Sequence, residues 1–254
     1  MNTIQITKKE SYAILKLQRG KVNAINHEMV KEIREVFTKF NQDKSIRGVI
    51  LTGIPNFFSA GLDVIELFSY NKEEISNFFE GFGGMFLDMV TFQKPLIAAI
   101  TGYSPAGGCV MAIACDSRIM AAGEKYTIGL NEVAVNIQIS QNLIDAYSFW
   151  IGSGKAHQYI LSGQLLKVDE AKEVGLIDEI VDLDRVLERA EEKMMSYLSS
   201  DDEILINTKK KLRKHWLENL ETNPKKDLQQ AAELWWKPEI RKKMEAFVMS
   251  LQKK

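Results

Sequence analysis

A glycine-rich junction at residues 102–109 constrains the fold of this chain more than any other feature. The apolar run before it, residues 95–100, indicates a buried strand. The segment after it, residues 107–115, is apolar with small side chains, which indicates a buried helix, and Pro105 suits the start of that helix. Backbone N–H groups at such a junction are free and carry partial positive charge. The junction therefore predicts a binding site for an oxygen atom that carries or develops negative charge.

The same plan occurs once before in the chain. Residues 47–53 form an apolar run closed by glycine, and the loop that follows carries Gly61. Asp63 with Glu66 resembles a capping box, so a helix should begin there, and an amphipathic helix should occupy residues 73–92 despite three glycines. Two repeats of strand, glycine-bearing loop and helix predict an α/β architecture.

Other segments extend this pattern on both sides. Further strands are expected at residues 3–8, 12–18, 116–122, 125–129 and 177–181. One further helix should follow Asn26, which would be its N-cap, and others are expected at 140–150, 155–161 and 169–175, the last capped by Asp169. Beyond residue 183 the chain is charged and helical, broken near Pro224 and Pro238. We therefore predict an α/β core at residues 1–190 and a helical region at 191–254, which would serve oligomerisation and cover the active site.

Composition excludes several classes of function. The formal net charge of −1 gives no field for nucleic acid or an anionic membrane, and no apolar run is long enough to span a bilayer. Cys109 and Cys115 lie in one predicted buried helix with a spacing that suits neither a metal nor a redox pair. The three histidines are too scattered for a metal site, and the N-terminus lacks a signal-peptide pattern. A cytoplasmic protein without a metal is the expectation.

Four segments together resemble one family. They are the glycine loops at residues 58–63 and 104–109, the segment 115–118 that ends the helix, and the segment 169–178. In this order and spacing they resemble the crotonase superfamily, the enoyl-CoA hydratase/isomerase family, over residues 12–181. The resemblance implies a spiral of ββα units that binds an acyl-CoA substrate and stabilises its thioester enolate. It also implies a homotrimer or a hexamer built as a dimer of trimers.

The resemblance assigns roles to residues of both loops. The backbone N–H groups of Leu62 and Gly107 would form the oxyanion hole. Contacts to the substrate and its CoA moiety would come from Val22, Ala24, Ala60, Gly61, Asp63 and Ala106. No cofactor is required, because the thioester itself takes up the electrons and coenzyme A is part of the substrate.

The position of the carboxylates narrows the reaction. Hydratases of this family use two glutamates, and Val110 stands at the position of the first, whereas Glu132 supplies the second. One carboxylate beside an oxyanion hole suits a proton shuttle between C2 and C4 of a 3-enoyl-CoA. The pattern is most similar to the mitochondrial-type Δ3,Δ2-enoyl-CoA isomerases of fatty acid β-oxidation. An apolar pocket around Glu132 would raise its pKa.

Alternatives remain open at this stage. A hydratase or another crotonase reaction would need a second polar group near Val110, for which Asn136, Gln138 and Asp145 are the candidates, and a catalytically silent CoA-binding protein is a third possibility. The segment 133–140 departs from the common family pattern and should line the acyl pocket.

Several charged and aromatic residues also have structural interpretations. Asp63 and Asp116 are expected to cap helices or pair with Arg118, and Glu124 is expected to be solvated. The charge run at residues 209–214 indicates a solvated helix face, with the CoA phosphates as an alternative partner. Trp216, Trp235 and Trp236 suggest packing against a large surface such as a subunit interface.

Overall fold

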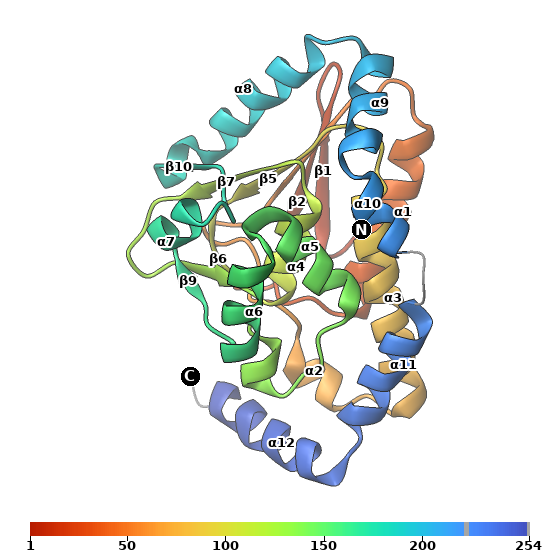
Figure 1. The fold of residues 1–254 in the computed structure, drawn as a ribbon, viewed down its shortest axis with the longest axis vertical. Helices are drawn as coiled ribbons and strands as arrows, with labels where there is room; N and C mark the ends of the chain where they lie inside the picture. Colours follow the sequence, from red (N-terminus) through yellow and green to blue (C-terminus); the bar gives the residue numbers. More distant parts are fainter. Residues whose placement is uncertain (221–223, 253–254) are drawn as a thin grey trace.

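The fold is built on two sheets in a computed structural model that describes residues 1–220 and 224–252 (Figure 1). The larger sheet has six strands in the order β1-β2-β3-β5-β7-β10, and the smaller has four in the order β4-β6-β8-β9. The strands of the larger sheet are β1 Ile4–Lys8, β2 Ala13–Leu17, β3 Val49–Thr52, β5 Leu96–Ile100, β7 Ser117–Ala121 and β10 Glu179–Val181. Those of the smaller sheet are β4 Asn56–Phe57, β6 Gly102–Pro105, β8 Thr127–Gly129 and β9 Leu166–Lys167.

Successive chain segments place one strand in each sheet. β3 and β4, then β5 and β6, then β7 and β8 follow one another, and each pair leads into helical structure. Pairing is parallel from β2 through β10 in the larger sheet and from β4 to β8 in the smaller, while β1–β2 and β8–β9 are antiparallel. This arrangement confirms the predicted spiral of ββα units.

Helices cover the sheets and extend beyond them (Figure 1). The helices before the tail are α1 His27–Gln42, α2 Val64–Phe68, α3 Lys72–Val90, α4 Gly107–Ala114, α5 Gln141–Ile151, α6 Ser153–Ser162 and α7 Val168–Glu173. The tail comprises α8 Val186–Leu198, α9 Asp202–Leu212, α10 Lys214–Leu220, α11 Pro224–Trp235 and α12 Pro238–Gln252. Short 3-10 helices occur at η1 Glu132–Val135 and η2 Leu183–Arg185. Pro224 and Pro238 each occupy the first position of a helix, where proline is tolerated.

Local sequence explains why α1 and α3 begin where they do. The Asn26 side chain accepts a hydrogen bond from the Met29 N–H, as predicted for an N-cap. Asn71 and Glu74 form a full capping box at the start of α3, which runs unbroken through its three glycines. Its phenylalanines, among them Phe78, Phe82 and Phe86, are buried in the main core.

The predicted boundary near residue 190 lies inside α8. Ala190 is fully buried, and with Val186 and Met194 it packs on Ile14, Ile50 and Ile97 of the large sheet. α8 therefore belongs to the core, because its apolar face covers one side of that sheet. The predicted boundary near residue 190 thus falls inside a helix that packs on the sheet, and the division into core and tail stays a prediction.

Two further local predictions need correction. Residues 102–105 form strand β6 rather than a loop, because β4 and β8 pair with it from both sides. Asp169 lies in the first turn of α7, whose N-cap is Lys167.

The tail tryptophans pack on the chain itself. Trp216 stacks on Phe149 with ring centroids 5.1 Å apart, and Trp235 meets Phe79 edge to face at 5.7 Å. Trp216 and Trp235 are almost fully buried within one chain. These two tryptophans therefore pack the tail against the rest of the same chain, so they do not support the predicted trimer or hexamer.

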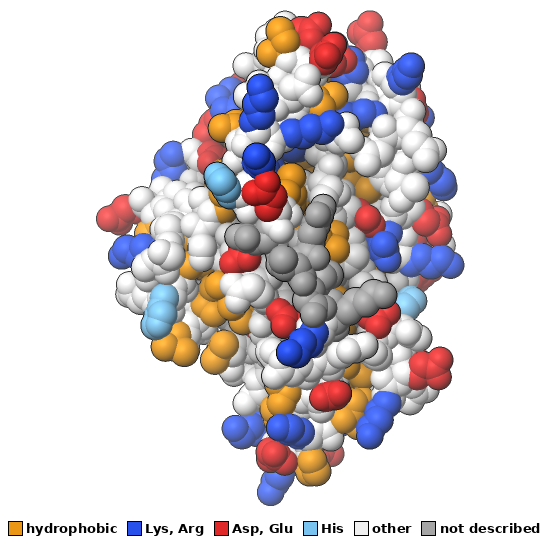
Figure 2. Space-filling model, turned by 45° about the vertical axis from the view of Figure 1, so that its right-hand side comes forward, with side chains coloured by type: hydrophobic (Ala, Val, Ile, Leu, Met, Phe, Trp, Pro, Cys, Tyr) orange, Lys and Arg blue, Asp and Glu red, His pale blue; other side chains and the backbone are white. Residues whose placement is uncertain are grey.

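Charged side chains of both signs are interspersed on the face shown in Figure 2. This agrees with the formal net charge of −1. Within the ranges 1–220 and 224–252, no helix has the length and apolar character needed to cross a membrane.

Candidate active site

A cavity of about 700 Å³ opens between the two glycine loops and the tail. Residues from several parts of the chain line it, among them the segment 22–24, the segment 60–65, helix α3, the segment 105–107 and the segment 131–143. The tail closes it through Leu228 and Ala231 of α11 and Phe247 and Leu251 of α12. Residues of α11 and α12 therefore form part of the cavity wall, and the covering of an active site by the tail stays a prediction.

Most of the predicted site residues meet at this cavity. The predicted residues that line it are Val22, Ala24, Ala60, Leu62, Asp63, Ala106, Gly107 and Glu132. Gly61 is not part of the lining, but it lies between the two loops. Their roles toward substrate stay predictions.

The backbones of the two glycine loops are in direct contact at Gly61 and Gly107. A methyl group on Gly61 would lie 3.1 Å from the Pro105 carbonyl oxygen and 3.4 Å from the Gly107 nitrogen. A methyl group on Gly107 would lie 2.8 Å from Ile25 Cδ1. Glycine is required at position 61, because a side chain there would crowd the Pro105 carbonyl oxygen of the second loop and the residue has a positive φ of 86°. At Gly107 a methyl group would meet the end of the Ile25 side chain, which can move aside.

The N–H groups of Leu62 and Gly107 are available to a ligand. Neither donates a hydrogen bond to another residue in the described part of the chain. Gly107 is the first residue of α4, where N–H groups lack an intrahelical partner. Its neighbour Ala106 has a φ of 46°, a strained conformation for a residue with a side chain. Such strain is characteristic of functional loops.

A network of ion pairs holds the first loop. The Arg19 guanidinium donates to Asp63 Oδ2 at 2.7 Å and to Glu66 Oε2 at 2.6 Å. Asp63 also caps α2, as predicted, by accepting from the Glu66 N–H. The Ser59 hydroxyl accepts from the Gly61 N–H and donates to the Asn23 carbonyl oxygen. These contacts fix the backbone on either side of Leu62.

Glu132 reaches the cavity because β8 pairs with the second loop. Pro105 is opposite Gly129 in the β6–β8 register, and the Ala106 N–H donates to the Gly129 carbonyl oxygen at 2.8 Å. η1 begins three residues later with Glu132. The short strand thus delivers a carboxylate directly beside the loop that carries Gly107.

The Glu132 carboxyl is buried and unpaired. The residue is 6% exposed, and Oε2 has no hydrogen-bond partner in the described chain. Burial away from water raises its pKa from 4.5 to about 7, as predicted from the sequence. A carboxyl with that pKa both accepts and returns a proton near neutral pH.

The other acids at the cavity have structural partners. Asp63 is bound by Arg19, and Asp227 accepts a hydrogen bond from the Gln141 N–H at 3.0 Å. Val110 is fully buried and does not contribute to the lining. Of the proposed partners for a second polar group, Gln138 lines the cavity, whereas Asn136 and Asp145 do not.

Asp116 pairs with the tail and not with Arg118. Lys209 Nζ and Arg213 Nη2 lie 2.6 and 2.8 Å from its two carboxylate oxygens. Arg118 instead binds Asp178 and stacks on Trp150. Lys209 and Arg213 are buried in this cluster, so the predicted solvated face holds only for Lys210, Lys211 and Lys214. None of these five lines the cavity.

Several residues in or beside the cavity carried no recognisable signal in the sequence. Arg19, which holds the first loop, lies in a loop without a pattern, and its partners Asp63 and Glu66 are distant in the chain. Phe82 and Phe86 follow a helical repeat that indicates a buried face but does not distinguish a core from a cavity wall. Asn131, with a buried, unpartnered amide oxygen, lies just before η1.

No metal site is evident at this cavity. Among the described residues there is no group of three or more His, Cys, Asp or Glu side chains suited to hold an ion. The cavity does hold the buried carboxyl of Glu132, and the N–H groups of Leu62 and Gly107 lie in two of its lining segments.

Comparison with known proteins identifies the family. The sequence profile described as "Enoyl-CoA hydratase/isomerase" matches residues 7–254. Mouse "Enoyl-CoA delta isomerase 1, mitochondrial" is 36% identical over 243 residues, which cover 95% of this chain and 84% of the mouse protein. The "Short-chain-enoyl-CoA hydratase" of Clostridium acetobutylicum is 31% identical over 194 residues, covering 76% and 74%.

The fold comparison agrees with the sequence comparison. The crystal structure of human mitochondrial delta3-delta2-enoyl-CoA isomerase superposes with a TM-score of 0.94 at 29% identity, covering 99% of each chain. The protein therefore belongs to the enoyl-CoA hydratase/isomerase family.

Proposed function

We propose that this protein is a Δ3,Δ2-enoyl-CoA isomerase that moves the double bond of an enoyl-CoA from the 3 to the 2 position. The observation that carries the proposal is one buried, unpaired carboxyl, Glu132, in a cavity shared with the free N–H groups of Leu62 and Gly107. The isomerase names of the mouse relative and the human structure support it.

The reaction begins with removal of a proton from C2. The ionised Glu132 carboxylate takes this proton, and the electrons of the C–H bond pass into the thioester to form a dienolate. The negative charge on the thioester oxygen is stabilised by the N–H groups of Leu62 and Gly107, and each such donor is worth on the order of 3 kcal/mol of barrier. The α4 N-terminus at Gly107 adds its dipole.

The reaction ends when the same carboxyl returns the proton at C4. The electrons of the dienolate then close a double bond between C2 and C3, and the thioester carbonyl is restored. Glu132 is again ionised, so no net proton is consumed. Because its pKa of about 7 lies near neutral pH, one group performs both transfers.

A second acid–base group is what separates hydration from isomerisation. Adding water across a double bond needs one group to orient the water and another to move a proton. Val110 is buried in the core, and Asp63 and Asp227 are engaged with partners. Gln138 lines the cavity, but an amide does not exchange protons near neutral pH. Isomerisation is therefore the reaction that the residues favour.

The substrate is an acyl-CoA, with its CoA end placed at Val22, Ala24 and Ala60. These residues line the cavity on the side of the loop that Arg19 holds. The thioester serves as the electron sink, so the mechanism requires no cofactor. A place in fatty acid β-oxidation follows from the chemistry, because unsaturated acyl chains yield 3-enoyl thioesters. A trimeric or hexameric assembly stays part of this proposal.

The test is turnover of a 3-enoyl-CoA by the wild-type protein and by Glu132→Gln. We expect the wild type to form the conjugated 2-enoyl thioester, which is followed by its absorbance. Glu132→Gln should lose about 10²- to 10⁴-fold in kcat, as for removal of a general base, while still binding a saturated acyl-CoA.

Glu124→Gln is the matched control, because Glu124 is an exposed glutamate outside the cavity. It should isomerise like the wild type. Undiminished isomerisation by Glu132→Gln would refute the mechanism. Faster hydration of a 2-enoyl-CoA than isomerisation of a 3-enoyl-CoA would favour a hydratase, and binding without either reaction would favour a silent homologue.

A further inference from the structure

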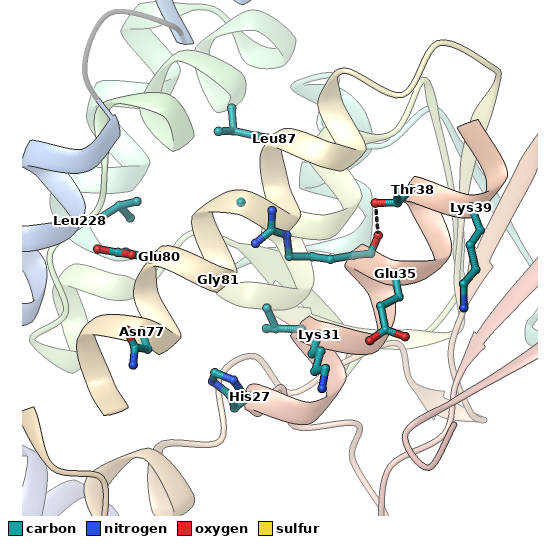
Figure 3. Close-up of a pocket in the computed structure, with 13 residues that line it drawn as sticks. His27, Lys31, Glu35, Thr38, Lys39, Asn77, Glu80, Gly81, Leu87 and Leu228 are labelled. Atoms are coloured by element: carbon teal, nitrogen blue, oxygen red, sulfur yellow. Dashed lines mark hydrogen bonds between the residues drawn. The ribbon is translucent and has the colours of Figure 1, made fainter. Parts of the chain in front are cut away.

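Helix α3 separates the active-site cavity from a second hollow, a surface groove of about 740 Å³ between α1 and α3 (Figure 3). Phe79, Phe82, Gly83 and Phe86 face the cavity. The groove side of the same helix consists of Asn77, Glu80, Gly81, Gly84 and Leu87. The two spaces are thus back to back along one helix.

Two adjacent glycines of α3 face the two spaces, Gly83 the cavity and Gly84 the groove. Each glycine inside a helix costs about 1 kcal/mol relative to alanine, so three of them in α3 call for a packing reason. At Gly83 a methyl group would lie 2.9 Å from Leu228 Cδ1. At Gly84 it would lie 2.7 Å from the Arg34 guanidinium carbon. Side chains from other elements therefore fill the space that these glycines leave.

Leu228 alone among the described residues lines both the cavity and the groove. It projects from α11 toward α3 (Figure 3), and both of its terminal methyl groups rest on Gly83. Its side chain is held there by van der Waals contact alone. Moving it would break no hydrogen bond or ion pair of its side chain.

We propose that Leu228 is a gate that sets which acyl lengths the enzyme accepts, an inference that rests on the proposed isomerase function. With CoA at residues 22–24 and the reacting carbons at Glu132, the alkyl chain extends toward the remaining wall of Phe82, Phe86 and Leu228. A chain longer than the cavity displaces Leu228 from Gly83 and continues into the groove.

The groove suits the distal part of an alkyl chain. Its lining includes the apolar side chains of Val30 and Leu87 and the backbone of α3 at Gly81, while the Arg34 guanidinium lies over Gly84. Lys31, Glu35 and Lys39 line the groove from α1 (Figure 3) and are exposed residues, and side chains of this kind can cover apolar surface with their alkyl stems while their charged heads stay in water. Leu228 lines both the groove and the active-site cavity, so the occupant of the groove is the tail of the substrate bound in that cavity.

The experiment compares kcat/KM for a short and a long 3-enoyl-CoA, of six and sixteen carbons, in three variants. Leu228→Ala opens the gate and should raise the long-to-short ratio. Leu228→Trp fills it and should lower the ratio on the order of tenfold, within the range that pocket fit confers. Leu87→Lys puts a charge in the groove but not in the cavity, and should lower the ratio while sparing the short substrate.

The ratio within one preparation does not depend on the fraction of folded enzyme, so a poorly folding variant still gives an answer. An unchanged ratio in all three variants would overturn the gate while leaving the isomerase proposal intact. Failure of the wild type to isomerise even the short substrate would instead refute the proposed function. A changed ratio in the Leu228 variants but not in Leu87→Lys would overturn the groove as the destination.

Discussion

Asp116 and Glu132 are carboxylates at the two ends of the β7–β8 segment, and they differ in whether cations neutralise them. Asp116 precedes β7, accepts hydrogen bonds from Lys209 and the Leu96 N–H, and forms an ion pair with Arg213. Glu132 follows β8, and its Oε2 has no partner in the described chain. A buried carboxylate matched by cations holds structure together, whereas one left alone is available for chemistry at the expense of stability.

The two regions depend on each other through the tail. Arg213 donates to the carbonyl oxygens of Val90 and Ala114, which lie at the ends of α3 and α4. α11 and α12 follow it in the chain and close the cavity with Leu228 and Phe247. The Asp116 cluster therefore anchors the tail that excludes water from Glu132.

Replacing the matched carboxylate should have the largest effect on stability. Asp116→Asn leaves the charges of Lys209 and Arg213 buried without a counterion, and losing one member of such a cluster costs about 3–5 kcal/mol. We expect that loss in the free energy of unfolding, measured by urea titration at pH 7. The control Asp184→Asn changes an exposed aspartate and should have no measurable effect. Equal stability of the two variants would remove Asp116 from its structural role.

The sequence was informative where chemistry is local. The strand before each glycine loop and the caps at Asn26 and Asp63 follow from short patterns, whereas the role of Glu132 came from the family resemblance and stays a prediction. β6 was missed because its four residues gain their pairing from β4 and β8, which are remote in sequence. The partner of Asp116 was missed for the same reason, since 93 residues separate it from Lys209.

Replacing the unpaired carboxyl should change stability in the opposite direction. Glu132 has a folded-state pKa of about 7 against an ordinary 4.5, so the folded state holds the proton more tightly than the unfolded state. Wild-type stability then falls as pH rises from about 4.5 to 7, by about 3 kcal/mol at about 1.4 kcal/mol per pKa unit. Glu132→Gln lacks this penalty. It should be more stable than wild type at pH 8 and equal at pH 4, by urea titration at both values, and a pH-independent difference would contradict the assignment.

The pH dependence of catalysis should report the same group. Proton removal from C2 needs the ionised form of Glu132, so kcat/KM for a 3-enoyl-CoA should rise with pH and level off above about 7. Below that pH the rate should fall tenfold per unit, which corresponds to about 1.4 kcal/mol of barrier. A flat profile from pH 5 to 8, measured where the wild type stays folded, would show that Glu132 is ionised throughout and that burial does not tune it.

Removing one of the two cations should have the smallest effect and should rank the partners of Asp116. Burial lowers the pKa of Lys209 to about 8, although the nearby Asp116 carboxylate acts to raise it. The free-energy cost of removing the ammonium from water therefore offsets part of the stability gained from the Lys209–Asp116 ion pair. Lys209→Met keeps an unbranched apolar side chain and removes the cost of desolvating the ammonium. Arg213 still neutralises Asp116, but the Lys94 carbonyl oxygen loses its hydrogen-bond donor. The net loss should be about 1 kcal/mol in the free energy of unfolding, well below that of Asp116→Asn. A loss as large as that of Asp116→Asn would make Lys209 the principal counterion and Arg213 chiefly a cap for α3 and α4.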